Sequence, residues 1–568
     1  MQSFDRRQFL ESAALIGMST TLFPGVLYAQ AVQDGELTIE TITHAEQIAG
    51  VSFSDEQREM MLNRLNRNLT SYEALRGIGL ENSVAPSQVF DPEMGRKEVP
   101  RLESRPEIEW TPTDVTLPAS DEDLAFSGVA ALAGLLKTRK VRSVDLTEIY
   151  LSRLRKYDGV LEAVVTLTEE RAFRLARKAD DELDAGLWRG PLHGIPWGAK
   201  DLLAVSGYPT TWGAEPYRNQ RMADDATVVK LLDEAGAVLV AKLTLGALAM
   251  GDVWFGGKTK NPWNLEVGSS GSSAGPGSAV AAGLVAFAIG SETLGSIVSP
   301  SNRNGVTGLR PTFGRVSRAG AMTLSWTMDK LGPMCRSAED CALVFSAIHG
   351  KDYADPTTLT APFEWPIRKS LRQLRIGYLQ DAFEEDHDNR EADLSSLEVL
   401  RKQGAELLPL TLPDGPAGAM LVMLNAEAAA AFDDLTRSGG VDSLVRQDAG
   451  AWPNSFRSSR FIPAVEYINA SRARTLLMQD MRELMGEIDV FVSPTFGGGT
   501  LRITNLTGHP SITVPNNFAP LEDDPTSNRR VPASITFVGG LYKDAEALAV
   551  AAAFQSGTDF HRMRPPIV

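Results

Sequence analysis

From about residue 121 onward, segments with helical spacing of apolar residues alternate with short, largely apolar runs. Leu146, Tyr150 and Leu154 recur at that spacing, and residues 227–234 continue it in a later segment. Residues 237–243 then form a run typical of a buried strand. These segments predict helices and strands in alternation.

The same alternation returns towards the C-terminus. Residues 375–380 and 489–493 predict strands, and residues 391–403 predict a helix that ends before Gly404. Alternation of this kind is typical of an α/β layer architecture with helices on both faces of a sheet.

The first 31 residues have a different pattern. Arg6 and Arg7 precede a weakly apolar stretch over 13–27, and small residues around Gln30 resemble a cleavage site. This segment resembles a twin-arginine export signal, which predicts a periplasmic or secreted bacterial protein. The alternative is an N-terminal helix with a chance arginine pair. No other segment has about 18 consecutive apolar residues, so we expect no stable membrane insertion after signal removal.

The next region, residues 32–120, is predicted to be a helical extension followed by a proline-rich linker. Ser54 and Gln57 fit a capping box at the start of a helix, and four prolines punctuate residues 100–118. We place the main domain at residues 121–568.

Composition narrows the function. The 568-residue chain has a net charge of -16, which disfavours nucleic acid as a partner. Its 2 cysteines and 6 histidines include no pattern for a zinc site, so we expect no metal and no cofactor. Cys335 and Cys341 suit buried thiols, although pairing after export is also compatible with the sequence.

Residues 267–314 are dense in glycine, serine and alanine, yet they contain the apolar run 284–289. A flexible linker lacks such a run. Small residues beside a strand permit tight turns and close backbone approach, which is how clusters of anion-stabilising amides are built.

Three segments together resemble the amidase signature family of serine hydrolases, in particular its exported members similar to peptide amidase. They are GIPWGAKD (194–201), NPWNLEVGSSGSSAGPGSAVAAG (261–283) and GSETLGSIVSPSNRNGVTGLRPT (290–312). The resemblance extends over residues 121–568 and implies a three-layer α/β/α fold with a large mixed central sheet. It also implies cleavage of a linear carboxamide C–N bond in a small-molecule or peptide substrate, and a possible homodimer.

The resemblance also assigns roles. Lys200 matches the family's catalytic lysine, Ser272 the serine held by a cis peptide bond, and Ser296 the nucleophile. Ser273 matches a supporting position beside the triad. The backbone amides of Thr293, Leu294, Gly295 and Ser296 match the oxyanion hole. An amide carbonyl is a poor electrophile, so its hydrolysis requires an activated nucleophile and oxyanion stabilisation.

The sequence departs from the commonest family pattern at several positions, and it leaves alternative functions open. Residues 274–276, Leu294, Val298 and Asn304 differ from the commonest family pattern, which affects loop geometry and substrate preference more than the reaction. The alternative functions are an inactive amidase-fold binding protein and a glutamine-hydrolysing amidotransferase A-type subunit. A further possibility is an α/β-hydrolase nucleophile elbow at Ser273, with His349 or His509 as its base.

Overall fold

The computed structural model describes residues 37–88, 108–113 and 115–567. The chain divides into two compact units. The smaller unit consists of the segment up to Pro86 together with residues 418–442 and 446–473, and the larger unit contains the rest. The predicted export signal lies outside the described residues.

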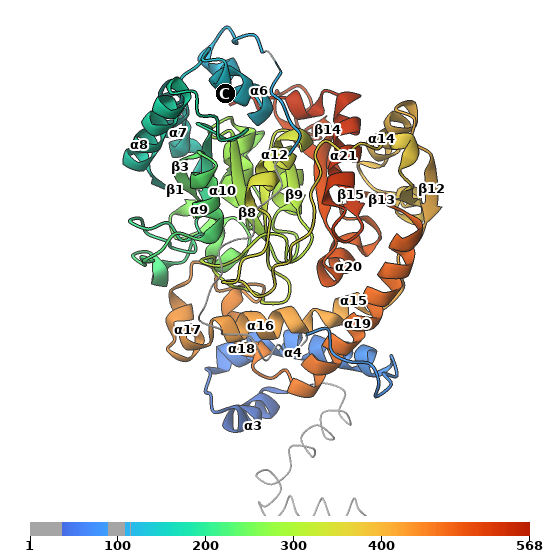
Figure 1. Cartoon of the computed structure of the whole chain (residues 1–568). Coiled ribbons are helices and arrows are strands. Elements are labelled where there is room, and N and C mark those ends of the chain that lie inside the picture. The colour runs from blue at the N-terminus through green and yellow to red at the C-terminus, as the bar shows by residue number, and fades with distance from the viewer. Residues whose placement is uncertain (1–36, 89–107, 114, 568) are drawn as a thin grey trace, which may run out of the picture. The chain divides into compact units, whose positions relative to one another are not determined.

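A mixed sheet of eleven described strands forms the centre of the larger unit (Figure 1). The order across the sheet is β1-β3-β2-β8-β10-β9-β14-β15-β13-β11-β12. The strands are β1 (Val164–Leu167), β2 (Pro196–Lys200), β3 (Val238–Leu243), β8 (Phe287–Glu292), β9 (Thr307–Arg310), β10 (Lys330–Cys335), β11 (Ile376–Leu379), β12 (Leu407–Leu410), β13 (Val490–Pro494), β14 (Ser511–Pro520) and β15 (Arg530–Gly539). β2 runs parallel to β3 and β8, whereas β8 and β10 are antiparallel, so the predicted mixed sheet is confirmed.

Helices cover both faces of the sheet, which confirms the predicted three-layer α/β/α fold. α12 packs against β9 and β10, α21 against β14 and β15, α10 against β8, and α11 against β9 and β14. The helices contained in the larger unit are α5 (Asp121–Ala125), α6 (Val129–Lys137), α7 (Ser143–Leu161), α8 (Glu169–Asp184), α9 (Thr227–Glu234), α10 (Ala274–Ala281), α11 (Val298–Asn304), α12 (Ala338–Ile348), α13 (Gln380–Glu384), α14 (Arg390–Lys402), α20 (Thr500–Thr507) and α21 (Asp544–Ser556).

The elements predicted from the apolar pattern form close to where they were expected. Helix α9 has the predicted bounds, and Gly236 after it has a φ of 82°, a left-handed conformation that favours glycine. All six residues of β3 are buried, as expected for a central strand. Leu151 and Leu154 of α7 share a hydrophobic cluster with strand β3 and helix α10.

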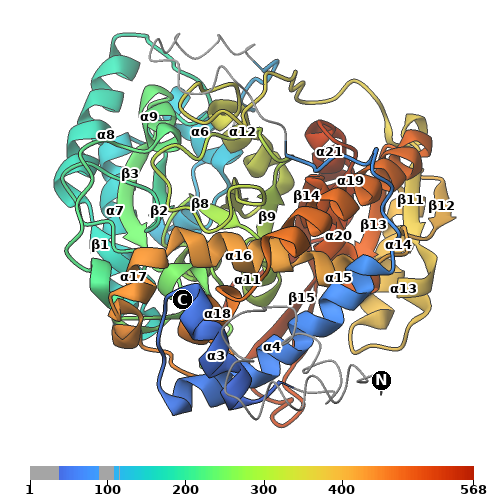
Figure 2. The same cartoon turned by 90° about the horizontal axis from the view of Figure 1, so that it is seen from below.

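The smaller unit is helical. Its helices α3 (Ile39–Ala49) and α4 (Asp55–Arg76) come from the N-terminal extension, and α16 (Val422–Ala431), α17 (Asp433–Arg437) and α18 (Trp452–Ser459) from the internal segment. Figure 2 shows α3, α4 and α18 together, and α4 packs against α18. The predicted capping box at Ser54 and Gln57 is present. Two further helices, α15 (Ala417–Met420) and α19 (Ala464–Glu487), cross the boundaries between the units.

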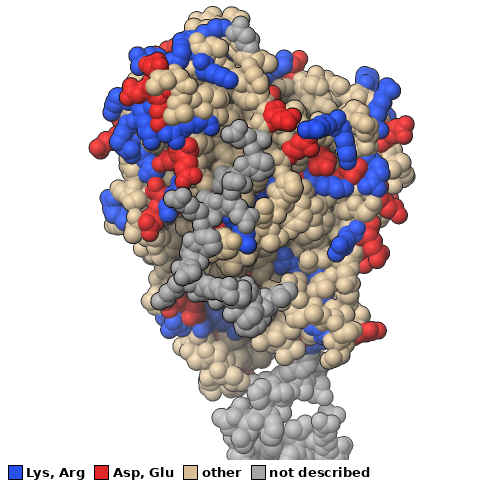
Figure 3. Space-filling model, in the orientation of Figure 1, with Lys and Arg blue, Asp and Glu red and all other residues tan. Residues whose placement is uncertain are grey.

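In the described part of the chain, no helix combines the length and apolar character needed to cross a bilayer. On the face of the larger unit shown in Figure 3, acidic and basic side chains are interspersed. A face with both signs of charge does not present a single extended electrostatic patch.

Candidate active site

The predicted lysine and serine segments meet at one edge of the central sheet. β2 ends at Lys200, and its parallel neighbour β8 is in register with it through the pair Ala199 and Ile289. Because parallel strands end at the same edge, Lys200 lies beside the last residues of β8. The antiparallel strand β10 begins at the same edge, where Lys330 pairs with Glu292.

Lys200 is fully buried and contacts three serine hydroxyls. Its Nζ lies 2.8 Å from Ser272 Oγ, 3.0 Å from Ser273 Oγ and 2.8 Å from Ser291 Oγ. Ser273 Oγ also accepts from the Ser291 amide and donates to the Ser291 carbonyl, both at 3.1 Å. The structure therefore brings the predicted lysine, the predicted cis serine and the predicted supporting serine together.

Burial lowers the pKa of Lys200 well below its usual range, whereas the nearby carboxylates of Asp329 and Glu292 act in the opposite direction. Desolvation disfavours the ammonium form because a charge is poorly stabilised away from water. A lysine with a depressed pKa offers a neutral amine that accepts a proton, which is the property of a general base.

Ser272 follows a cis peptide bond from Gly271, as the family resemblance implied. Close backbone contact explains the glycine at position 271, because a Cβ there would lie 1.9 Å from the carbonyl oxygen of Gly251. Ser272 itself is 1% exposed. The serine is thus held inside the protein, with its hydroxyl against the lysine amine.

Ser296 lies on a tight turn between β8 and α11. Its carbonyl accepts a hydrogen bond from the Ser273 amide at 3.1 Å, which ties the two serine segments together. The Ser296 side chain is partly exposed, and its hydroxyl hydrogen-bonds to no described residue. A hydroxyl that is accessible and uncommitted suits a nucleophile.

The turn also presents unused backbone donors. The amides of Thr293, Leu294, Gly295 and Ser296 donate to no other residue that the structure describes. Gly295 has a φ of 87°, which favours glycine and lets the chain reverse within the turn. Because backbone amides are nearly always hydrogen-bonded in folded proteins, four consecutive free donors suit an anion or oxyanion site.

The buried carboxylate of Glu292 fixes the end of this turn. Glu292 Oε2 accepts from the amides of Ile297 at 2.8 Å and Val298 at 3.0 Å. Its Oε1 accepts from Arg310 Nη1 at 2.9 Å and Asn505 Nδ2 at 2.8 Å. Burial alone would raise the pKa of Glu292, but Arg310, Lys330 and these hydrogen bonds lower it to about 2. Glu292 thus remains ionised and fixes the residues that follow Ser296.

We expect Glu292→Gln to lower the free energy of unfolding by about 3–5 kcal/mol, the usual effect of removing one partner of a buried ion pair. Arg310 would then retain an uncompensated charge in the interior. Equilibrium urea denaturation at neutral pH measures this change. Glu266→Gln is the matched control, since the Glu266 side chain is 76% exposed and its pair with Arg529 should contribute less than about 1 kcal/mol.

The pH dependence of this contribution follows from the sign of the shift. The folded pKa of Glu292 is about 2, below its ordinary value of about 4.3. The stabilisation is therefore present above about pH 4.3 and is lost as the pH falls towards 2. An equal effect of Glu292→Gln at pH 2.5 and pH 7 would contradict the role of the ionised carboxylate.

Two acidic residues, Asp201 and Asp252, and the two cysteines have structural roles. Asp201 forms a buried ion pair with Lys242 at 2.6 Å and accepts a hydrogen bond from the Thr211 amide. Its carboxylate is therefore engaged in structural contacts and does not act as an acid. Asp252 accepts from the Ser270 amide at 3.1 Å. Cys335 and Cys341 are buried free thiols.

The nucleophile-elbow alternative has no support in the geometry. Ser273 Oγ contacts Lys200 and Ser291, whereas His509 hydrogen-bonds Thr507. A nucleophile elbow requires a strand directly before the serine, and the segment before Ser273 contains β7 (Asn264–Gly268). This strand pairs with β6 (Lys260–Asn261) in a separate two-stranded sheet and does not lead into the central sheet.

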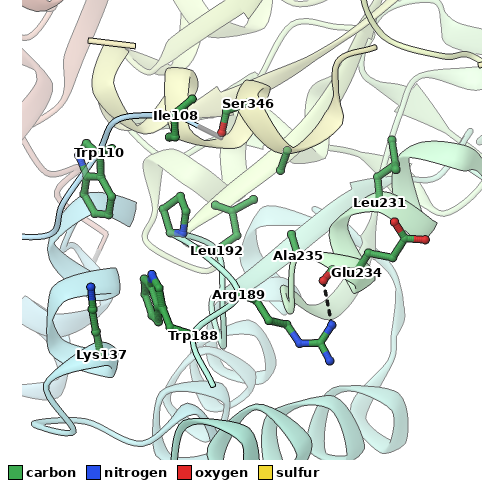
Figure 4. A pocket seen from close by; sticks show the side chains of 13 residues that line it. Ile108, Trp110, Lys137, Trp188, Arg189, Leu192, Leu231, Glu234, Ala235 and Ser346 are labelled. Carbon is green, nitrogen blue, oxygen red and sulfur yellow. Dashed lines mark hydrogen bonds between the residues drawn. The ribbon is translucent and has the colours of Figure 1, made fainter. Parts of the chain in front are cut away.

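A cavity of about 480 Å³ lies elsewhere in the larger unit. Trp110, Lys137 and Trp188 line one part of it, and Arg189 donates from Nη1 to the Glu234 carbonyl at 3.0 Å in another part (Figure 4). None of the predicted catalytic residues lines this cavity. It is therefore separate from the lysine and serine cluster.

Sequence reasoning missed three residues of the site. Ser291, Glu292 and Asp329 all contact the lysine or the turn, and Asp329 Oδ1 accepts from the Thr293 hydroxyl at 2.6 Å. Ser291 and Glu292 lie within the glycine- and serine-rich segment, but their contacts depend on the register of β8 with β2 and β10. That register is not visible in a single sequence.

Comparison with known proteins agrees with this geometry. The model of the family described as Amidase matches residues 145–548. The chain is 33% identical over 489 residues to the A subunit of glutamyl-tRNA(Gln) amidotransferase from Halorhodospira halophila, covering 77% of this chain and 98% of that one. The relative with the same description from Roseiflexus castenholzii is 32% identical over 487 residues, covering 77% and 97%.

Solved structures show the same relationship. The native peptide amidase from Stenotrophomonas maltophilia superimposes with a TM-score of 0.67 at 29% sequence identity, covering 78% of this chain and 98% of that one. The family match covers most of the chain, including the segments that carry the lysine and the serines. The protein belongs to the amidase signature family, as the sequence motifs predicted.

Proposed function

We propose that this protein hydrolyses a linear carboxamide, with Ser296 as nucleophile, Ser272 as proton relay and Lys200 as base. The observation that carries the proposal is the fully buried contact of 2.8 Å between Lys200 Nζ and Ser272 Oγ. The four free amides at residues 293–296 support it, because they lie on the turn that carries Ser296. Membership of the amidase family supports amide hydrolysis in general.

The hydrogen bonds around Lys200 give the relay a direction. The hydroxyl of Ser273 donates to the Ser291 carbonyl, so its oxygen accepts from the lysine. A neutral amine has two N–H donors and one lone pair. If Ser273 and Ser291 accept the two donors, the lone pair is left for the proton of Ser272. Ser272 Oγ then accepts the proton of the Ser296 hydroxyl as that oxygen attacks.

The reaction has two stages, formation of an acyl-enzyme and its hydrolysis. Ser296 Oγ attacks the amide carbon and its proton passes through Ser272 to Lys200, while the amides of residues 293–296 stabilise the oxyanion. The C–N bond breaks as the proton returns through Ser272 to the leaving nitrogen, which releases ammonia or an amine. Water then attacks the acyl-enzyme by the same relay, releasing the carboxylate and restoring Ser296. The proposal requires no metal or cofactor.

The proposal is tested with the purified mature protein and a panel of primary and secondary amides, with ammonia or amine release as readout. We expect turnover of at least one amide in water without ATP and without a second protein. Inactivity across the panel, together with no labelling by a fluorophosphonate probe, would point to an inactive amidase-fold binding protein.

A second candidate is a glutamine-hydrolysing amidotransferase A-type subunit. The curated relatives at 32–33% identity carry that description, which favours this candidate. The net charge of -16 and the helical N-terminal extension favour the independent hydrolase. Glutamine hydrolysis that requires added partner proteins, without turnover of other amides, would support the amidotransferase.

We further propose that the protein is exported by the twin-arginine route, on the basis of Arg6, Arg7 and the residues that follow them. Replacing both arginines with lysine should retain the protein in the cytoplasm of a bacterial host, measured by cell fractionation. Unchanged export of that variant would refute this route.

A further inference from the structure

The cavity of about 480 Å³ in the larger unit lies at the strand ends opposite those that carry the candidate active site. Residues 188–192 form part of its wall and precede β2, which then runs to Lys200. Leu231 and Glu234 of α9 also line it, shortly before β3 begins parallel to β2. The five residues of β2 span about 16 Å at the usual rise per residue. The cavity and the catalytic lysine are thus at opposite ends of the same strand.

One end of the cavity, which we call the aromatic end, contains the indoles of Trp110 and Trp188 together with the Lys137 side chain (Figure 4). Trp110 Nε1 donates to Glu339 Oε1 at 3.1 Å, and the Trp188 ring lies 6.0 Å from the ring of His193. Both indoles are partly exposed, so a ring that enters the cavity would cover apolar surface that water now contacts. A cavity of this size with apolar walls and few polar groups is typical of a small-molecule site.

The loop that carries Trp188 is fixed by hydrogen bonds. The Arg189 amide donates to His193 Nδ1 at 3.2 Å, and His193 Nε2 lies 3.0 Å from Glu182 Oε2. Because Nδ1 accepts a hydrogen bond, the proton of the neutral imidazole is on Nε2 and is donated to Glu182. Arg189 Nε also donates to Glu182 at 2.6 Å. A ligand therefore meets a wall that is already ordered, which lowers the entropic cost of binding.

The Lys137 side chain supplies a positive charge at the aromatic end. Lys137 is the last residue of α6 and is exposed. Its Nζ lies 5.3 Å from the centroid of the Trp188 ring, which is close enough for a cation–π interaction. It forms no ion pair with any residue in the described ranges. The ammonium group is therefore available to a ligand carboxylate whose ring lies against the indoles.

The nearby carboxylates have other contacts or lie at the far end of the cavity. Glu182 is paired with Arg189. Glu339 does not line the cavity and accepts from the Trp110 indole. Glu234 lies away from the aromatic end, and its carbonyl accepts from Arg189 Nη1 at 3.0 Å (Figure 4). Because attraction between charges falls with distance, this arrangement favours an anionic group at the aromatic end.

We propose that this cavity is a second ligand site for an aromatic carboxylate, whose ring stacks on the indoles of Trp110 and Trp188 and whose carboxylate pairs with Lys137. The inference does not depend on the proposed function, since neither Lys200 nor Ser296 lines the cavity. The ligand binds at the opposite end of β2 from the lysine, so it leaves the candidate active site open.

The test is calorimetric titration of the purified protein with 2-naphthoate and with its uncharged analogue 2-naphthalenemethanol. We expect one naphthoate site per chain. Lys137→Met should weaken naphthoate binding about fivefold, the scale of one exposed ion pair, and should change binding of the alcohol by less than about twofold. Lys230→Met is the matched control, because Lys230 is an exposed lysine of α9 that does not line the cavity.

Trp188→Ala should weaken binding of both compounds about tenfold or more, and Trp188→Phe should restore most of that loss. Trp326→Ala removes a 48% exposed indole outside the cavity and should have no effect. Absence of binding to the parent, or naphthoate binding that is unchanged in Lys137→Met and Trp188→Ala, would overturn the site. Equal losses of acid and alcohol in Lys137→Met would overturn the carboxylate assignment. Ser296→Ala should bind naphthoate as the parent does, so a failure of the hydrolase proposal leaves this test intact.

Discussion

Ser296→Ala is expected to lower amide turnover by about 10⁴-fold or more, the scale seen when a serine hydrolase loses its nucleophile. The reason is that no other described hydroxyl combines partial exposure with a position on the turn of free amides. Ser272 and Ser273 are buried against Lys200, so neither replaces Ser296 without a rearrangement. Steady-state ammonia release from the best amide of the panel measures the loss.

The fold should survive this change. The Ser296 hydroxyl bonds to no described residue, so its removal should change the free energy of unfolding by less than about 1 kcal/mol. Ser299→Ala is the matched control: it removes a hydroxyl three positions along the chain that lies 2.8 Å from Ser270 Oγ, and it should retain most of the turnover. Covalent labelling by a fluorophosphonate probe should persist in Ser299→Ala and vanish in Ser296→Ala. Labelling that persists in Ser296→Ala would contradict the assignment of the nucleophile.

Local pattern was enough to predict many of the helices and strands. Helix α9 and strands β3, β11 and β13 agree with apolar periodicity and with the glycines that end segments. The order of strands was not predictable in this way, because β2 contacts β8 across a long stretch of intervening sequence. Pairing of that kind depends on tertiary packing that a single sequence does not display.

The N-terminal extension shows the same limit of local reasoning. Its helices were predicted, yet their partners come from a segment nearly four hundred residues away. Arg76 forms an ion pair with Glu466, and Phe53 and Phe461 make an edge-to-face ring contact at 6.4 Å. The apolar face of an amphipathic helix predicts that it packs against something, without identifying the partner.

In the candidate site, motif resemblance located Lys200, Ser272 and Ser296 because their segments are distinctive in composition and spacing. The supporting groups were harder to recognise. Glu292 and Asp329 are ordinary acidic residues in the sequence. Glu292 gains its role from burial and from hydrogen bonds to the turn, and Asp329 from its hydrogen bond with the Thr293 hydroxyl. Their functions arise from desolvation and geometry, which appear only when the chain has folded.

Lys200→Met is expected to lower amide turnover by about 10³-fold, within the range attributed to a positioned general base. Methionine fills a similar volume with an apolar side chain, so the fully buried site should accept it. The loss should be steepest for amides with poor leaving groups, because the relay also returns the proton to the departing nitrogen. The rate with a labile phenyl ester should fall less. Equal losses on ester and amide would argue against proton return through Lys200.

The parent enzyme should gain activity as the pH rises through the depressed pKa of Lys200, because the ammonium form below that pKa cannot accept a proton. Ser291→Ala is the comparison variant: it keeps the amine and removes one hydrogen-bond partner, which is worth about 1 kcal/mol or roughly fivefold in rate. It should retain a rising profile. A flat profile in the parent, with the chemical step shown to limit the rate, would contradict the neutral amine as base.

Stability supplies an independent readout of the same ionisation. The pKa of Lys200 is lower in the folded protein than its ordinary value of about 10.4 in the unfolded chain. Between these two values the unfolded chain binds more protons, so the contribution of this group to the free energy of unfolding increases with pH across that window. Lys200→Met should remove this contribution. The increase of the free energy of unfolding with pH should then be shallower by the amount that one bound proton contributes, measured by urea denaturation at several pH values. If the slope is unchanged in Lys200→Met, the lysine is not desolvated in the way its burial implies, and the proposed relay loses its physical basis.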